Sequence, residues 1–168
     1  LMDMGIHCVD LLQYISGLQA REVAAFVGNQ TFGYSADDSA SVLLKMEGGA
    51  LAYVDANFNI PDAAARCRLE IYGTRGSILA EGTISQVEGG KCEVVLSDDS
   101  LGYDAAQDRV DVVPLELDVS FGNMYTKEIE AFGRAIEEDG EPPVSGCDAI
   151  RVQKIIEAAY RASEQKTT

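Results

Sequence analysis

The chain opens with a helical pattern of apolar positions. Val9, Leu12 and Ile15 recur at the spacing of one helix face. Ser16 and Gly17 follow where a left-handed residue commonly ends a helix. The pattern therefore predicts a first helix that ends at Ser16.

Beyond this helix the apolar pattern changes to alternation, and runs of β-branched and aromatic residues are separated by turn residues. The alternation predicts strands at 22–29, 39–46, 50–59, 66–72, 77–81, 84–88, 91–97 and 110–117. Glycine pairs at 48–49 and 89–90 are typical of tight hairpins, so we expect much of the sheet to be antiparallel. The polar segment 97–109 is interpreted as a surface loop, and 73–76 as a turn.

The predicted strand at 50–59 has two unlike faces. Leu51, Tyr53 and Asp55 lie on one side, whereas Val54 and Ala56 lie on the other. A sheet with one apolar face needs helices or another subunit to cover that face.

Two closing helices are predicted near the C-terminus. Asn123 is placed to cap the first of them, and Pro142-Pro143 enforces a break after it. Ser145, with Asp148 three residues later, is typical of a capping box that opens the final helix. The order of elements predicts an α+β fold: an open, mostly antiparallel sheet with helices packed on one face.

Composition narrows the class of protein. A chain of 168 residues with 46% hydrophobic content is expected to form a single domain over 1–168. Its 13 basic and 28 acidic residues give a net charge of −15, which disfavours nucleic acid and anionic membranes as partners. We find no apolar run of the roughly 20 residues that a membrane span needs. Four scattered cysteines are interpreted as reduced thiols of a cytoplasmic protein, although an even count leaves a disulfide open.

The candidate chemistry lies on the first helix. His7 is the only histidine, with Asp3 four residues before it and Asp10 three after it. If 3–14 is helical, these side chains and Tyr14 share one polar stripe. An imidazole beside a carboxylate is suited to proton transfer near neutral pH.

Two other interpretations of the stripe stay open at this point. Asp3 could cap the helix, or form a surface ion pair with His7 worth only about 0.3 kcal/mol. A shared metal ion is the other alternative, but no second histidine or cysteine stands at ligand spacing. We therefore predict no metal site.

Five segments of the chain resemble the motifs of one family, in the same order. They are Asp3-Met-Gly-Ile-His7-Cys-Val-Asp10, then Asp37-Asp38-Ser-Ala-Ser-Val-Leu-Leu, then Ile71-Tyr-Gly-Thr-Arg-Gly-Ser77, and finally the Tyr125-Thr-Lys-Glu128 and Pro143-Val-Ser-Gly146 segments of the closing helices. Together they resemble the C-terminal domain of the glucose-fructose oxidoreductase and inositol dehydrogenase family, called Gfo/Idh/MocA.

The resemblance implies a role for each candidate residue. The histidine that matches His7 exchanges a proton with a substrate hydroxyl, and the aspartate that matches Asp3 lies beside it. Asp10 is a candidate to bind a sugar hydroxyl, with an internal hydrogen bond as the alternative. Arg66 is a candidate substrate-facing side chain of the sheet, with solvent exposure or an ion pair as the alternative.

Parts of the family pattern are missing. The chain has no Gly-x-Gly-x-x-Gly turn, and none of its lysines lies in the Glu-Lys-Pro segment of the family's catalytic group. We therefore expect a substrate-binding and oligomerisation domain that is incomplete at its N-terminus, with the Rossmann domain absent. A sheet edge left open in this way, or the open sheet face, is expected to pair with another copy in a homo-oligomer.

The leading hypothesis is the substrate domain of a dehydrogenase. The intact parent would use NAD or NADP to move a hydride to or from a secondary alcohol of a sugar or polyol. The chain alone is expected to bind no cofactor and to be inactive. The alternative hypothesis is a non-catalytic binding or assembly module in which the Asp3 and His7 stripe is purely structural.

Overall fold

The fold is taken from a computed structural model that describes residues 1–86, 89–96, 113–119 and 122–165. These residues form two compact units, Leu1–Asp62 with Pro142–Thr168, and Ala63–Glu141. The predicted loop at 97–109 lies outside the described residues. No helix in the described part of the chain is long and apolar enough to cross a membrane.

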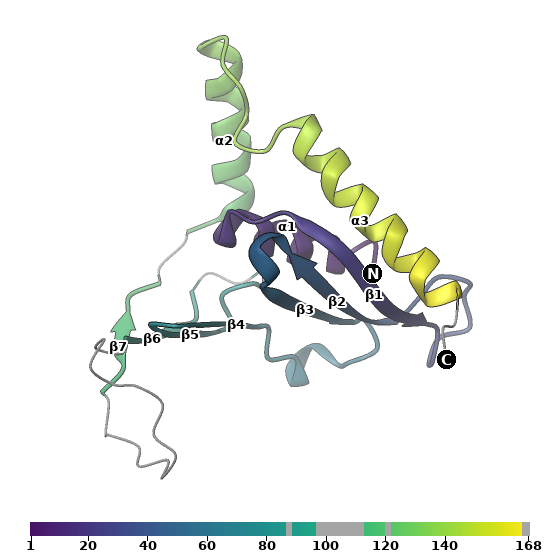
Figure 1. The fold of residues 1–168 in the computed structure, drawn as a ribbon. Helices are drawn as coiled ribbons and strands as arrows, with labels where there is room; N and C mark the ends of the chain where they lie inside the picture. The colour runs from purple at the N-terminus through teal and green to yellow at the C-terminus, as the bar shows by residue number, and fades with distance from the viewer. Residues whose placement is uncertain (87–88, 97–112, 120–121, 166–168) are drawn as a thin grey trace. The chain divides into compact units, whose positions relative to one another are not determined.

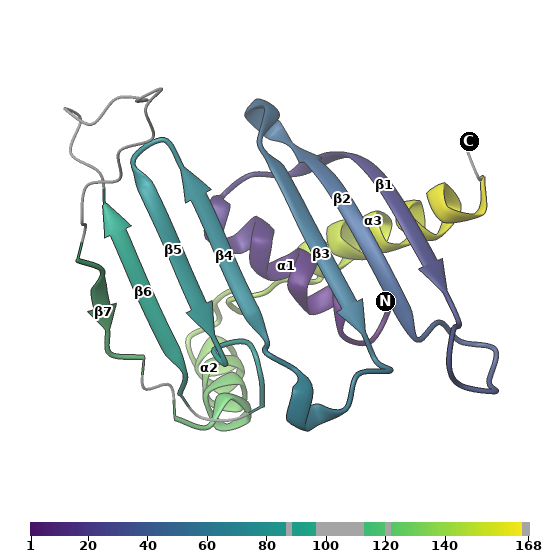
Figure 2. The same ribbon diagram turned by 90° about the horizontal axis from the view of Figure 1, so that it is seen from below.

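The first unit is a three-stranded antiparallel sheet with two helices on one face (Figure 1). Its strands are β1 (Ala20–Gly28), β2 (Ser39–Met46) and β3 (Leu51–Asn57), with β2 in the centre. The helices α1 (Gly5–Ser16) and α3 (Gly146–Glu164) contact β3 and β1, respectively, and also contact each other. Seen from below, the three strands lie in front of both helices, so no helix in the described part of this unit lies on the other face of the sheet (Figure 2).

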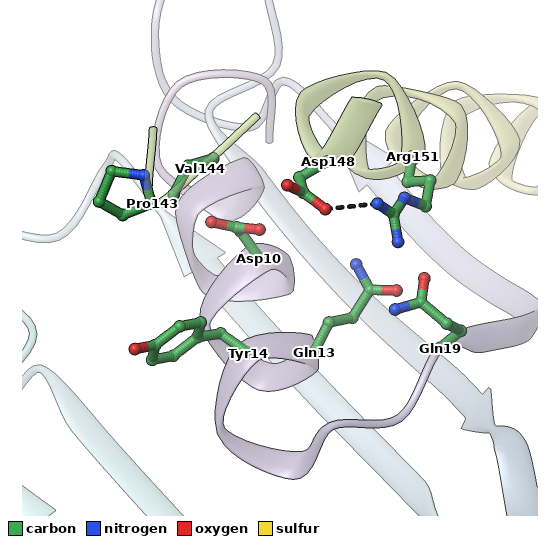
Figure 3. A pocket seen from close by; sticks show the side chains of 8 residues that line it. All are labelled: Asp10, Gln13, Tyr14, Gln19, Pro143, Val144, Asp148 and Arg151. Carbon is green, nitrogen blue, oxygen red and sulfur yellow. Dashed lines mark hydrogen bonds and ion pairs between the residues drawn. The ribbon is translucent and has the colours of Figure 1, made fainter. Parts of the chain in front are cut away.

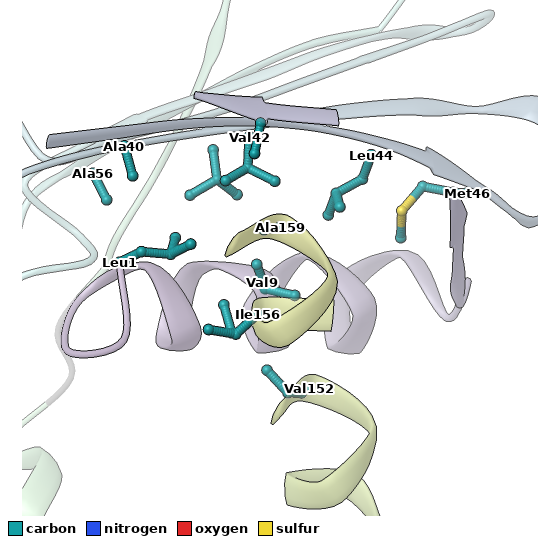
Figure 4. Close-up of a cluster of buried hydrophobic side chains, with 12 residues drawn as sticks. Leu1, Val9, Ala40, Val42, Leu44, Met46, Ala56, Val152, Ile156 and Ala159 are labelled. Carbon is teal, nitrogen blue, oxygen red and sulfur yellow. The ribbon is translucent and has the colours of Figure 1, made fainter. Parts of the chain in front are cut away.

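The core of this unit lies between the sheet and the two helices (Figure 4). Along β2 the buried residues are Ala40, Val42, Leu44 and Met46, in strict alternation with half-buried or exposed ones. Alternation of this kind turns every second side chain of a strand to the same face. Apolar side chains of the two helices pack against that face. They are Val9 of α1 and Val152, Ile156 and Ala159 of α3.

The second unit contains a four-stranded antiparallel sheet in the order β4-β5-β6-β7 (Figure 2). Its strands are β4 (Arg68–Gly73), β5 (Gly76–Glu81), β6 (Lys91–Leu96) and β7 (Leu115–Leu117), and α2 spans Met124–Glu137. The α+β class with antiparallel strands is thus confirmed, but the strands form two hydrogen-bonded sheets. The expectation of a single domain stays a prediction.

Several local predictions are confirmed by the backbone. Gly17 takes a left-handed conformation with φ 66° and ends α1, and Asn123 accepts a hydrogen bond from the backbone N–H of Thr126 at the start of α2. Ser145 and Asp148 form the capping box of α3. The turn between β2 and β3 uses Gly48 and Gly49, both at positive φ.

The predicted strand at 84–88 is wrong for its described residues 84–86, which form bends. Gly82 has φ 74° and ends β5. The Ser85 hydroxyl then donates to the carbonyl oxygen of Gly82 at 3.3 Å, so the chain curls back instead of extending. The predicted strand at 110–117 shortens to Leu115–Leu117 within the described residues.

Polar contacts hold α3 against the sheet. The Tyr160 hydroxyl donates to the Asp37 carboxylate at 2.6 Å, and Ser163 Oγ accepts from the backbone N–H of Val27 at 2.8 Å. Burial, together with the hydrogen bond to Asp37, raises the pKa of Tyr160 to about 12. The hydroxyl therefore stays a donor across the physiological range.

Asp38 organises the connection between β1 and β2. Its carboxylate, only 1% exposed, accepts hydrogen bonds from the backbone N–H groups of Gln30, Thr31 and Phe32 at 2.7–3.0 Å. Burial alone acts to raise the pKa of this carboxyl, but the three amide donors outweigh it and hold the pKa below its usual value. The charged form of Asp38 is thus the form that the fold stabilises.

We expect Ile156→Ala to lower the free energy of unfolding by about 2–5 kcal/mol, because it leaves a cavity at a fully buried position. Ile150→Ala on the same helix is the control, since Ile150 is 57% exposed. Urea unfolding of both variants measures the difference. Equal losses would contradict the described core.

We expect Asp38→Asn to be less stable than the wild type at neutral pH. The difference in stability between the two proteins should become smaller at acidic pH. The folded pKa of Asp38 lies below its unfolded value of 3.8, so its contribution is present above that value and is lost as pH falls below it. Melting temperatures of both proteins between about pH 6 and about pH 3 measure the gap. A gap that stayed constant with pH would count against the carboxylate as its source.

Candidate functional site

Helix α1 places His7 by burying its opposite face. Its buried residues are Gly5, Val9 and Gln13, at intervals of four. His7 falls two residues from both Gly5 and Val9, so it projects from the other side of the helix and is exposed. The exposed histidine is therefore held by a helix that the core fixes in place.

Gly5 brings the start of α1 close to the sheet. A Cβ atom at this position would lie 2.5 Å from Leu1 Cδ1 and 3.5 Å from the Cβ of Ala56 in β3. The distance to Ala56 is an ordinary contact, so a larger residue here would have to displace only the flexible end of the Leu1 side chain.

Asp3 lies outside the helix. The stripe was expected to include Asp3 in helical geometry, but α1 begins at Gly5 and Asp3 occupies the turn before it. Met4 stands at the N-cap without a side-chain hydrogen bond, so Asp3 is not the cap. Among the described residues, the side chains of Asp3 and His7 make no hydrogen bond or ion pair.

A polar pocket of about 150 Å³ lies beside the second half of α1 (Figure 3). All its residues belong to the first unit. It is lined by Asp10, Gln13, Tyr14, Gln19, Pro143, Val144, Asp148 and Arg151. The pocket thus includes two members of the predicted stripe, Asp10 and Tyr14, but neither Asp3 nor His7.

The far wall of the pocket is the first turn of α3. Asp148 accepts hydrogen bonds from the backbone N–H and the hydroxyl of Ser145, and it forms an ion pair with Arg151 (Figure 3). The Ser145 hydroxyl and backbone N–H lower the pKa of Asp148, and Arg151 adds to that effect. Asp148 is therefore held as a carboxylate at the rim of the pocket.

Sequence reasoning missed Gln13, Gln19 and Arg151. Gln13 is a polar residue on the buried face of α1, only 7% exposed. Gly5, Val9 and Gln13 recur every four residues along the helix. This spacing could have identified Gln13 as a residue of the buried face. Gln19 and Arg151 carried no signal, because only the packing of α1 against α3 brings them together.

Arg66 belongs to the second unit. It is exposed and forms an ion pair with Glu81 at 3.2 Å. Sequence analysis gave such an ion pair as the alternative to a substrate-facing role for Arg66. Arg66 is not among the residues that line the pocket. In the described part of the chain, no group of three histidine, cysteine or acidic residues could hold a metal ion.

Comparison with known proteins identifies relatives of the whole chain. The sequence model of the family described as "Oxidoreductase family, C-terminal alpha/beta domain" (GFO_IDH_MocA_C) matches residues 1–168. The uncharacterized oxidoreductase YrbE of Bacillus subtilis (strain 168) is 30% identical over 166 residues, which cover 96% of this chain and 45% of the relative. Myo-inositol 2-dehydrogenase of Thermotoga maritima is 27% identical over 169 residues, which cover 98% of this chain and 47% of the relative.

Solved structures share the fold. The aldose-aldose oxidoreductase of Caulobacter crescentus, complexed with glycerol, superimposes with a TM-score of 0.78 at 22% identity. The superposition covers 98% of this chain and 45% of that structure. The chain spans about half the length of the curated relatives that it matches.

Proposed function

Because the chain belongs to the Gfo/Idh/MocA oxidoreductases, as their C-terminal alpha/beta domain, we propose that it is the substrate domain of an NAD(P)-dependent dehydrogenase. The reaction is hydride transfer between nicotinamide and a secondary alcohol of a sugar or polyol. The observation that carries the proposal is an exposed His7, on a helix fixed by the core, in a chain whose relatives are oxidoreductases.

In this proposal His7 is the catalytic proton acceptor or donor. Oxidation of an alcohol releases its hydroxyl proton as the hydride leaves, and a neutral imidazole can accept that proton near neutral pH. Exposure leaves the His7 ring accessible to a substrate. Asp3, four residues earlier in the preceding turn, would orient the ring and stabilise its charged form.

Asp10 of the first unit and Arg66 of the second unit are proposed separately as residues that contact a substrate. The half-buried Asp10 carboxylate accepts hydrogen bonds only, which suits a substrate hydroxyl as donor. Arg66 would have to give up part of its contact with Glu81 to reach a substrate.

The residues of this chain do not fit a dinucleotide. Its strands pair antiparallel, and its sequence lacks the Gly-x-Gly-x-x-Gly turn that cradles a pyrophosphate. We therefore assign NAD or NADP to a nucleotide-binding half of a longer protein. The proposed parent is cytoplasmic and acts on small molecules, with no nucleic acid or membrane partner.

Self-association is the second element of the proposal. The face of the first sheet away from α1 and α3 exposes the apolar side chains Phe26, Leu43, Leu51 and Tyr53. The register pairs Leu43 with Tyr53, whereas Phe26 lies opposite Ser41 and Leu51 opposite Lys45. A second copy would cover this face or pair with an open edge of the sheet.

We expect His7→Ala to lower the turnover of the longer protein by about a hundredfold or more, because it removes the proton acceptor. Lys154→Ala on the exposed side of α3 is the control and should keep wild-type turnover. Steady-state rates with a polyol substrate measure both. Unchanged turnover in His7→Ala would instead favour a non-catalytic assembly module.

Titration calorimetry of the chain alone with NAD should show no binding, and tight binding would refute the assignment of the cofactor to another half of a longer protein.

We expect the chain to form a homo-oligomer that Phe26→Ser weakens, because Phe26 is 85% exposed on the open face. Phe58→Ser is the control, since Phe58 lies beyond the end of β3. Light scattering after gel filtration gives the mass of each protein. A stable wild-type monomer at high concentration would argue against both the face and the edge as interfaces.

A further inference from the structure

The backbone that leads into α1 is held at Leu1 by hydrogen bonds on both sides of that residue. The nitrogen of the buried Leu1 donates to one oxygen of the Asp37 carboxylate, and its carbonyl oxygen accepts from the backbone N–H of Ile6 at 3.1 Å. The second of these bonds closes a turn that contains Asp3 and ends one residue before His7. The position of Leu1 therefore helps to fix both residues of the proposed proton-transfer group.

Helix α3 completes the hold on this segment. The Tyr160 hydroxyl donates to the other oxygen of Asp37 at 2.6 Å, so one carboxylate joins α3 to the backbone before α1. Burial is the main cause that raises the pKa of Tyr160, whereas the backbone N–H of Met2 acts to lower it, which places that amide beside the hydroxyl oxygen. The Asp37–Tyr160 pair thus faces the backbone at two successive residues, Leu1 and Met2.

The Asp37 carboxylate is suited to hold a backbone in place. Burial alone acts to raise its pKa, but the donors at Leu1 and Tyr160 outweigh burial and hold the pKa below its usual value. Hydrogen bonds to such a charged acceptor are stronger than those between neutral groups. In a longer protein the Leu1 nitrogen is a peptide amide, which remains a donor to Asp37.

We propose that Asp37 and Tyr160 are positioning residues, which fix the turn that carries Asp3 and the first turn of α1 that carries His7. The inference rests on the proposed function, in which His7 transfers the proton. Proton transfer needs hydrogen-bond geometry between the imidazole and the substrate hydroxyl, so a displacement of about 1 Å lowers the rate. Asp37 and Tyr160 act through the backbone and not through contact with the substrate.

Nuclear magnetic resonance on the chain itself tests the positioning. His7 is the only histidine, so the untagged chain gives a single set of imidazole signals. Tyr160→Phe removes the hydroxyl that bonds Asp37 and should shift or split these signals. Imidazole signals identical to those of the wild type would overturn the proposal.

Ser163→Ala is the matched control on the same helix. Ser163 also joins α3 to the sheet, but through hydrogen bonds with the backbone of Val27 in β1 and not with the segment before α1. Its loss weakens the contact between α3 and the sheet and should leave the His7 signals unchanged. Equal shifts in Tyr160→Phe and Ser163→Ala would overturn the proposal, because they would indicate a general loosening of α3.

Two substitutions of Asp37 test the carboxylate separately. Asp37→Asn keeps an oxygen that can accept from Leu1 and gains an amide that can donate to the Tyr160 oxygen, so the His7 signals should stay near their wild-type positions. Asp37→Ala removes both contacts and should shift the signals as Tyr160→Phe does. If Tyr160→Phe fails to fold, this pair of variants decides, and equal His7 signals in the two would overturn the proposal.

Kinetics of the longer protein connect the positioning to the reaction. Tyr160→Phe should lower kcat about tenfold and leave KM unchanged, whereas Ser163→Ala should leave both unchanged. Wild-type kcat in Tyr160→Phe, where His7→Ala is inactive, would overturn the proposal. Wild-type turnover in His7→Ala would refute the proposed function itself, so the two failures are distinguishable.

Discussion

The first unit depends on the burial of one apolar face of the β1–β2–β3 sheet beneath α1 and α3. Val42 and Leu44 of the central strand are fully buried, as are Val9 and Ile156 of the helices that cover them. Removal of such side chains from water is the largest favourable contribution to folding. The chemistry of the unit follows from this burial, because the core fixes α1 along Gly5, Val9 and Gln13 and so leaves His7 on the outer side. A helix less firmly packed would hold the imidazole in many orientations.

The same packing creates a polar pocket beside an apolar core. Gln13 lies on the buried face of α1, where a leucine would add to the core. Its amide oxygen instead accepts from the backbone N–H of Ala20 at the start of β1, and the side chain lines the pocket. Asp148 likewise serves two purposes, since it completes the cap of α3 and pairs with Arg151. Asp148 thus both caps α3 and lines the pocket.

Local chemistry made part of this structure predictable. Gly17, Asn123 and the Ser145–Asp148 pair end or begin helices through contacts within a few residues, which a sequence displays directly. Strand β2 matches its predicted bounds, 39–46, because a sheet covered on one face imposes strict alternation. The polar stripe was expected to include Asp3 in helical geometry, but α1 begins at Gly5 and Asp3 lies in the turn before it. The pocket escaped prediction because Gln13 and Arg151 are 138 residues apart in number and meet only through the packing of two helices. The division of the strands into two sheets is also a tertiary outcome that alternation does not encode.

The first unit is assembled from two separated stretches of sequence, with the whole second unit between them. Helix α3 contributes Val152, Ile156 and Ala159 to the core, and these residues follow all the described strands in the sequence. While the second unit is being synthesised, the apolar face of the sheet is therefore covered only in part, by α1. The hydrogen bond between Ser163 and Val27 spans 136 residues, so it can form only after both ends of the unit have been made. Until α3 is made, part of the apolar face of the sheet has no cover, and exposed apolar surface of this kind favours aggregation.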